Sequence, residues 1–208
     1  RLSEYSLEHL NALLARGVNF TYATARSVGS AMRALQGLNI SMPAVYYNGG
    51  LVYDRTTGKT LKYTCFEDTL KAYVLSVLES FGIMPFVYSA TEKRENVVWR
   101  LGKESFGMKR YLNRRQGDCR LLAANTDAEL LTGYVFYFKC IGPKEQIEQA
   151  WNVLKYDPRV ICIFHQEMYQ NDFWMEISPR DATKANAVAF LKEHLGYDRL
   201  VCFGDTSN

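Results

Sequence analysis

The sequence predicts an α/β fold in which a layer built on a parallel sheet is interrupted by an inserted α+β module. Helix-like and strand-like segments alternate at short spacing over residues 3–48 and again near the end of the chain, as they do when helices pack on a parallel sheet. Between these stretches, a helix followed by two strands occurs twice, which is typical of an antiparallel sheet covered by two helices. We therefore expect residues 1–64 to form the first part of a core, residues 65–174 the insert, and residues 175–208 the second part of the core.

The first part of the core begins with an amphipathic helix over residues 3–17, which Ser3 or Ser6 caps and Gly17 ends. The alternating run VNFTYAT, residues 18–24, predicts a strand. The remaining elements expected here are a helix over residues 28–38, a strand over 44–48 and a hairpin over 51–64 that turns at Thr57-Gly58.

The insert opens with a helix over residues 66–82, in which apolar residues recur at helical spacing. Its other expected elements are strands over residues 84–90 and 96–102, a short helix over 105–114, strands over 119–124 and 133–142, a helix over 144–156, and strands over 159–166 and 173–179. Tyr134, Phe136 and Phe138 alternate along one of these strands, so we expect them to face the core of the insert.

The last segment returns to the pattern of the first. Residues 183–196, TKANAVAFLKEHLG, predict an amphipathic helix that ends at Gly196. The run RLVCFGD, residues 199–205, predicts a buried strand of the parallel type, with polar residues directly after it.

Composition argues against nucleic-acid and membrane partners. The net charge is only +3, and the nearest approach to a basic cluster, formed by Lys109, Arg110, Arg114 and Arg115, is interpreted as a solvated helix face. No apolar run approaches the ~18 residues that a membrane span needs. Because Arg1 leads straight into a polar helix start, no signal peptide is expected.

Five cysteines occur without a CxxC pair. An odd number of cysteines without metal-binding spacing indicates reduced, mostly buried thiols in a cytoplasmic protein. We expect a monomer or a weak dimer.

Eight candidate site residues lie after the strands of the predicted parallel layer or near the start of its last helix. Ligands bind at the carboxyl ends of the strands in open α/β sheets. These residues are Thr24, Ala25 and Arg26 after the first strand, Asn48 and Gly49 after the second, Lys184 near the start of the last helix, and Asp205 with Asn208 after the last strand.

Each of these residues also has a purely structural interpretation. Thr24 could cap the following helix, and Asn48-Gly49 could be only a tight turn. Lys184 could be a solvated surface lysine, and Asp205 could be a turn former. Taken together they suit phosphoryl transfer, because a hydroxyl, a helix N-terminus and a lysine bind phosphate oxygens while a carboxylate binds Mg²⁺.

Four segments in order resemble the motifs of the haloacid dehalogenase (HAD) superfamily, and within it the Cof-type sugar-phosphate phosphatases with a type IIB cap. FTYATARSVGSAMRALQGL resembles the second motif, and AVYYNGGLVYD resembles the Asn-Gly-Ala segment. EISPRDATKANAVAFLKEHLG resembles the third motif with its lysine, and RLVCFGDTSN resembles the start of the fourth. The resemblance covers the whole chain and implies a partial Rossmann-like core with an α+β cap at residues 65–174.

The resemblance also implies roles for the residues at the strand ends. Thr24 would bind the transferring phosphate, and Lys184 would bridge the phosphate and the nucleophile's carboxylate. Asp205 would hold Mg²⁺, directly or through water, and Asn208 would help at the metal or at the phosphate. The other implied site residues are Asn48 and Gly49, which would line the substrate edge, and Ala25 and Arg26, which form the second-motif turn. The substrate would be a small phosphorylated metabolite, over which the cap would close.

Two departures from the family pattern bear on activity. Ala25 stands where the family has a glycine, and the Asp-x-Asp-Gly-Thr motif, which contains the nucleophile and the general acid and base, is absent from the 208 residues. The second aspartate of the fourth motif would follow Asn208. We expect the chain to be an internal piece of a phosphatase and to show no turnover by itself.

Three other functions fit parts of the pattern. A protein that binds a phosphometabolite without cleaving it is compatible with the missing first motif. A phosphomutase of the same superfamily would need the same nucleophile, so product analysis is required to separate it from a phosphatase. A nucleotide-dependent oxidoreductase is disfavoured, because no GxGxxG turn follows a strand.

Overall fold

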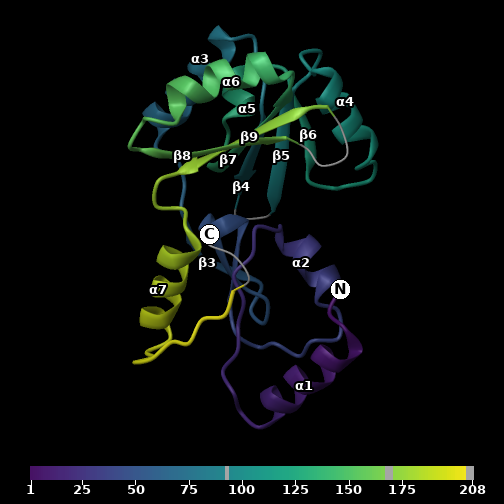
Figure 1. Cartoon of the computed structure of the whole chain (residues 1–208), viewed down its shortest axis with the longest axis vertical. Coiled ribbons are helices and arrows are strands. Elements are labelled where there is room, and N and C mark those ends of the chain that lie inside the picture. The colour runs from purple at the N-terminus through teal and green to yellow at the C-terminus, as the bar shows by residue number, and fades with distance from the viewer. Residues whose placement is uncertain (92–93, 167–170, 205–208) are drawn as a thin grey trace. The chain divides into compact units, whose positions relative to one another are not determined.

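The computed structural model describes residues 1–91, 94–166 and 171–204, and it divides into two compact units (Figure 1). The first unit contains Arg1–Thr64 and Asp181–Asn208, and the second contains Cys65–Arg180. The second boundary falls after Arg180 rather than after residue 174, because β9 (Phe173–Pro179) is one unbroken strand of the second unit's sheet. We describe each unit by itself.

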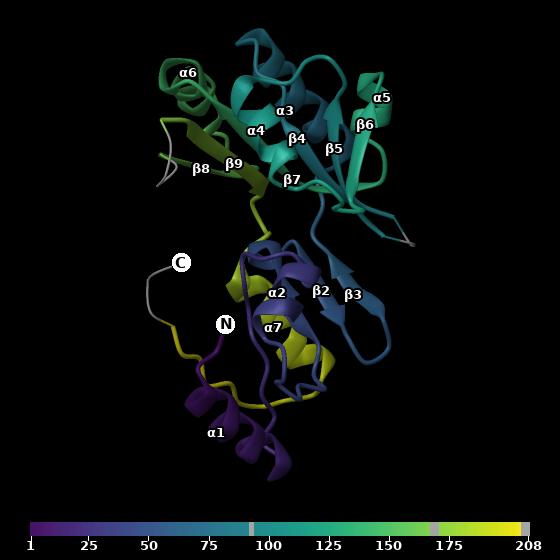
Figure 2. The same cartoon turned by 90° about the vertical axis from the view of Figure 1, so that its right-hand side faces the viewer.

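The first unit has a three-stranded antiparallel sheet in the order β1-β2-β3, with a helix on one face. Its elements are α1 (Glu4–Ala15), α2 (Val28–Ala34), β1 (Ala44–Tyr46), the 3₁₀ turn η1 (Tyr47–Gly49), β2 (Leu51–Asp54), β3 (Lys59–Tyr63) and α7 (Lys184–His194). Figure 2 shows the β2–β3 hairpin with α7 alongside this sheet. Val45 and Val52 of the sheet form a buried cluster with Ala187 and Leu191 of α7, and burial of a valine or leucine side chain is worth roughly 1.5–3 kcal/mol.

The expected parallel sheet is reduced to one point of contact in this unit. Residues 18–24 form no strand, and their sheet pairing is a single parallel bridge between Ala23 and Val45. Two hydrogen bonds flank it: the Thr24 amide donates to the Val45 carbonyl (2.9 Å), and the Val45 amide donates to the Tyr22 carbonyl (3.0 Å). The α/β class is therefore correct, but the described strands of this unit pair antiparallel.

The prediction of a buried strand over residues 199–205 is wrong for the part that the structure describes. Residues 199–204 are neither in a strand nor buried, and Phe203 is 94% exposed. A β-strand needs a neighbour for its backbone hydrogen bonds, and no described strand pairs with this run. Apolar composition alone therefore did not identify its conformation.

The second unit is a six-stranded sheet in the order β6-β5-β4-β7-β9-β8. Its strands are β4 (Phe86–Ala90), β5 (Glu95–Arg100), β6 (Leu121–Ala124), β7 (Tyr134–Gly142), β8 (Val160–Gln166) and β9 (Phe173–Pro179), and its helices are α3 (Asp68–Ser80), α4 (Phe106–Asn113), α5 (Asp127–Leu130) and α6 (Lys144–Leu154). Only β5 and β6 pair parallel, and the other strand pairs are antiparallel, as predicted for the insert.

The main core of this unit lies between the sheet and two helices. α3 and α6 cover one face, where side chains such as Val74, Leu78 and Ile147 pack on Phe138 and Met175. The opposite face is partly covered by α4. Its Tyr111 ring lies 4.7 Å from Phe86 and 6.2 Å from Trp174, measured between ring centroids.

A β-bulge on β7 changes which residues face that core. The pairing of β4 with β7 passes from Tyr88–Tyr137 to Ser89–Val135, so Phe136 is the extra residue. Val135 and Phe138 therefore both belong to the core cluster, and Tyr134 is 51% exposed. The expectation that all three face the core is correct for Phe136 and Phe138, which are buried, and wrong for Tyr134, because a strict period of two does not continue through a bulge.

No helix in the described ranges is long and apolar enough to cross a membrane.

Candidate functional site

Thr24 lies directly after the parallel bridge, where its backbone amide is bonded to Val45 and its side-chain hydroxyl takes part in a local turn. The Thr24 Oγ1 accepts a hydrogen bond from the amide of Arg26 at 3.2 Å. The cap of α2 is Ser27, whose Oγ accepts from the Ser30 amide at 3.3 Å. Thr24 therefore does not cap the following helix. It is half-buried, whereas Ala25 and Arg26 are exposed.

The η1 turn lies beside this loop and has an unusual backbone. Tyr47 and Asn48 both lie in the left-handed region, with φ of 50° and 56°, and Gly49 follows with φ of 110°. The Asn48 amide donates to the Thr24 carbonyl (3.0 Å), and the Tyr47 amide donates to the Arg26 carbonyl (3.2 Å). Left-handed non-glycine residues are strained and occur often at functional sites. Asn48-Gly49 is thus more than a tight turn, because it holds the loop that carries Thr24.

The start of α7 meets η1 on its other side. Thr183 caps this helix, with its Oγ1 accepting from the Asn186 amide at 3.0 Å, and Lys184 is the first helical residue. A Cβ on Gly49 would lie 2.2 Å from the Thr183 carbonyl oxygen, so the two backbones touch. Lys184 is half-buried and makes no hydrogen bond or ion pair with any described residue. No described residue therefore occupies its ammonium group, and an ammonium group can bind an anion.

Six of the eight predicted site residues thus belong to one assembly in the first unit. It consists of the loop 24–26, the η1 turn and the start of α7, and we call it the strand-end junction. The Thr24 hydroxyl, the Lys184 ammonium and the positive end of α7 all favour an anion. Such an arrangement can bind a phosphate group and neutralise charge that develops on it.

The expected Mg²⁺ ligands, Asp205 and Asn208, lie outside the described residues. Within the described residues, no group of three or more His, Cys, Asp or Glu side chains could hold a metal ion. Mg²⁺ prefers several oxygen ligands around it. The described part of the junction therefore does not form a magnesium site by itself.

The basic cluster on α4 is not simply a solvated helix face. Arg110 forms an ion pair with Asp172 and lies over the ring of Phe106, and Arg115 lies over the ring of Tyr111 at 4.2 Å. Arg110 and Arg115 are therefore engaged within the second unit.

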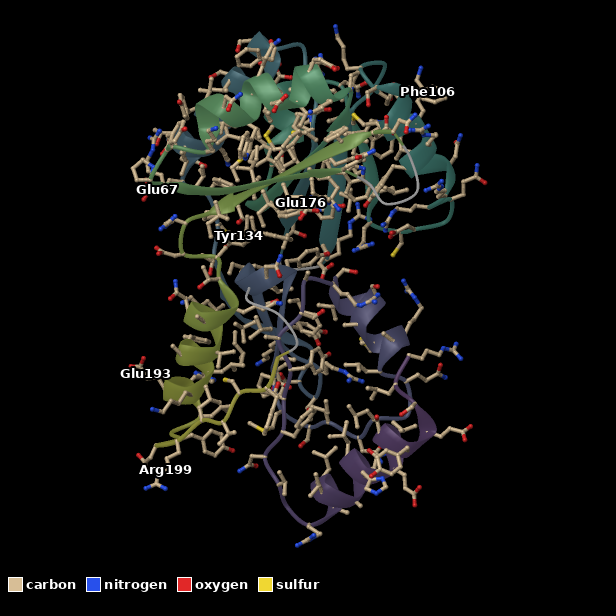
Figure 3. All side chains as sticks on the ribbon, in the orientation of Figure 1. Glu67, Phe106, Tyr134, Glu176, Glu193 and Arg199 are labelled. Atoms are coloured by element: carbon tan, nitrogen blue, oxygen red, sulfur yellow. The ribbon has the colours of Figure 1, made fainter. Side chains whose placement is uncertain are left out.

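A polar cluster on the sheet of the second unit was not predicted from the sequence. Lys139 Nζ lies 3.3 Å from Glu176 Oε1, and it also lies 4.5 Å from the centroid of Trp174. Burial and the neighbouring Glu176 raise the pKa of Tyr137 well above its usual value. Glu176 alternates with the core residues Met175 and Ile177, so it points away from α3 and α6 (Figure 3). The pairing of β7 with β9 brings these charges together, and no local sequence pattern shows that register.

Several solved structures share this fold. A haloacid dehalogenase-like hydrolase from B. subtilis superposes with a TM-score of 0.69 at 16% identity, over 95% of this chain and 74% of that chain. A Bacteroides thetaiotaomicron protein, described among the phosphatases of the haloalkanoate (HAD) enzyme superfamily, gives 0.69 at 8% identity, over 95% and 67%. A HAD/COF-like hydrolase from Plasmodium vivax gives 0.65 at 16% identity, over 94% and 68%. The chain thus has the fold of HAD-like hydrolases.

The sequence identifies the family. The profile of the haloacid dehalogenase-like hydrolases matches residues 1–208, so the chain belongs to this family. No curated protein matches the sequence. The family resemblance seen in the four motifs is therefore confirmed, and the type of hydrolase is a matter for proposal.

Proposed function

We propose that this protein is a Mg²⁺-dependent phosphatase of small phosphate esters, in particular sugar phosphates. In the whole protein the reaction proceeds through an aspartyl-phosphate. The observation that carries the proposal is the strand-end junction. Segments in the order of the HAD motifs are joined there by the hydrogen bonds of Asn48 and Tyr47 to the loop 24–26 and by the contact of Gly49 with Thr183. One solved structure with this fold is described among phosphatases, which supports hydrolysis of a phosphate ester.

In this proposal each residue of the junction has a defined task. The Thr24 hydroxyl and the Lys184 ammonium bind the phosphate, with Ala25 and Arg26 shaping the turn between the bridge and α2. Asn48 and Gly49 line the substrate edge. Asp205 and Asn208 contribute to Mg²⁺ binding, and the segment around Ala23 is a strand of a parallel, Rossmann-like core next to β1. The parallel bridge between Ala23 and Val45 supports that last assignment.

The second unit acts in this proposal as the cap that selects a small phosphorylated metabolite. Its size, its mostly antiparallel sheet and its position in the chain between the two core segments support that role. A cytoplasmic location agrees with the five free thiols.

A protein that binds a phosphometabolite without cleaving it is the second candidate. It describes what these 208 residues would do by themselves, because the Asp-x-Asp-Gly-Thr motif that supplies the nucleophile in the HAD mechanism is not among them. For the same reason, the 208-residue chain is expected to release no phosphate from an aryl phosphate with Mg²⁺.

Calorimetric titration with inorganic phosphate tests the phosphate site. We expect the chain to bind phosphate and Lys184→Met to weaken binding about tenfold or more, because a hydrogen bond to a charged group is worth about 1.5–3 kcal/mol. Lys192→Met, in the last turn of the same helix, is the matched control and should bind as the wild type does. Equal affinity of the two variants for phosphate, or no binding by the wild type, would contradict the proposal. Mg²⁺-dependent release of phosphate from an aryl phosphate by the 208-residue chain would contradict its expected inactivity.

A further inference from the structure

We propose that Gly49 is a positioning residue, which sets the distance between the Lys184 end of α7 and the loop that carries Thr24. The proposal rests on the proposed function, because its readout is phosphate binding. It differs from a substrate-lining role, since it requires no contact between Gly49 and substrate.

The first step is that only glycine fits at position 49. Its φ of 110° lies outside the range that L side chains readily adopt. A Cβ there would lie 2.2 Å from the carbonyl oxygen, 2.4 Å from the carbonyl carbon and 2.8 Å from the amide nitrogen of Thr183. These are backbone atoms, so no side-chain rotation can relieve the overlap.

The second step is that the atoms against Gly49 begin α7. The Thr183 carbonyl accepts the first hydrogen bond of the helix from the Ala187 amide at 3.0 Å. The Thr183 amide donates to the Asp181 carbonyl at 2.9 Å, and the Asn186 side chain donates to the same carbonyl at 3.1 Å. Because the helix start is tied in this way, a displacement of Thr183 would also move Lys184, the next residue.

The third step is that η1 is fixed on its other side. Its Asn48 amide bonds the Thr24 carbonyl and its Tyr47 amide bonds the Arg26 carbonyl. The turn therefore acts as a spacer between the hydroxyl of Thr24 and the ammonium of Lys184. The left-handed conformations of Tyr47 and Asn48 are what allow one short turn to reach both neighbours.

A double-mutant cycle on the full 208-residue chain tests this role. Inorganic phosphate is titrated into the wild type, Gly49→Ala, Lys184→Met and the double variant. If Gly49 acts through Lys184, Gly49→Ala alone weakens binding about tenfold, whereas in the Lys184→Met background it changes binding by less than about twofold. If Gly49 had a purely structural role, Gly49→Ala would weaken phosphate binding by the same factor in the wild type and in the Lys184→Met background.

Gly196→Ala is the matched control. Gly196 also has a positive φ, of 70°, and follows α7 at its other end, but apart from its two chain neighbours no described residue lies within 4 Å of its Cβ position. This variant should lose stability through backbone strain while its phosphate affinity stays within about twofold of the wild type. A loss of affinity equal to that of Gly49→Ala would show that any disturbance of α7 suffices, and would overturn the proposal.

A second variant covers the case in which Gly49→Ala does not fold, as judged by its amide NMR spectrum. Thr183→Ala removes the cap of α7 without adding an atom, so it loosens the same helix start. Its effect on phosphate binding should also disappear in the Lys184→Met background. An effect that persists there would overturn the proposal. If instead the wild type binds no phosphate, or Lys184→Met binds phosphate as the wild type does, the proposed function fails together with the inference. If Lys184→Met weakens phosphate binding as expected but its effect is independent of the effect of Gly49→Ala, only the inference fails.

Discussion

At the scale of single residues, the first unit contains a buried tyrosine pair that couples its stability to pH. The hydroxyl of Tyr46 is hydrogen-bonded to that of Tyr22 at 2.6 Å, and Tyr46 has no exposed surface. Burial, and then the hydrogen bond with Tyr22, raise the pKa of Tyr46 above its usual value near 10. The unfolded chain therefore releases this proton at lower pH than the folded chain does.

We expect the free energy of unfolding to fall as the pH rises above about 10, with a slope of up to ~1.4 kcal/mol per pH unit for this one group. The stabilisation is complete below the pKa of the unfolded tyrosine, and it is lost as the pH rises toward the pKa of the folded one. Tyr46→Phe should cost about 1 kcal/mol at pH 8 and reduce the alkaline slope. Urea titrations between pH 8 and 11 measure both quantities.

Tyr5→Phe is the control for this experiment, because Tyr5 is 70% exposed in the same unit. It should leave the alkaline slope unchanged. If Tyr46→Phe and Tyr5→Phe had the same slope, Tyr46 would not be the group that titrates.

At the scale of elements, helices and the hairpin could be predicted from the sequence more reliably than the strands of the first unit. α7 begins at the lysine that follows its cap, and the β2–β3 hairpin turns at the predicted Thr57-Gly58, because these features depend on local sequence. Residues 18–24 and 199–204 are as apolar as true strands, but strand formation also depends on a partner that lies far away in sequence. The bulge on β7 was invisible for the same reason.

The candidate site shows the same division. Which residue types gather at the strand ends could be predicted, since motif order places Thr24, Asn48 and Lys184. The left-handed pair in η1 could not, because it depends on hydrogen bonds to the separate loop 24–26. The backbone contact of Gly49 with Thr183 could not either, because it joins two segments more than 130 residues apart in the sequence.

The edge strand β8 illustrates how one element is protected from association. β8 lies at the end of the sheet order, and its sequence VICIFHQ contains no lysine or proline to discourage pairing with another chain. The indole N–H of Trp151 on α6 donates to the Cys162 carbonyl of this strand at 3.3 Å, and the Trp151 ring stacks on Phe164. α6 therefore occupies part of the open edge.

Trp151→Phe should expose this edge, because phenylalanine keeps an aromatic ring but cannot donate to the Cys162 carbonyl. We expect more dimer or larger species in light scattering after size-exclusion chromatography. Trp99→Phe is the matched control, since it also removes an indole donor, the one that bonds Glu104 at 2.9 Å on a different strand. Equal association of both variants would show that the edge of β8 is not responsible.

At the scale of the whole molecule, the site and the larger core belong to different units. The second unit has its own six-stranded sheet and hydrophobic core, whereas the strand-end junction lies wholly in the first unit. The junction nevertheless draws on both ends of the chain, since η1 precedes the second unit in sequence and α7 follows it. A bound phosphate group should therefore contact residues from two distant stretches of the sequence, both of which belong to the first unit.

The most direct test is an amide NMR titration of the ¹⁵N-labelled chain with inorganic phosphate. We predict saturable shifts at residues 24–26, 47–49 and 183–185, with one shared dissociation constant, and their loss in Lys184→Met. Amides of the second unit, including those beside Lys139 and Glu176, should not shift with that constant. Shifts confined to the second unit, or none at the junction when phosphate binds, would contradict the assignment of the phosphate site.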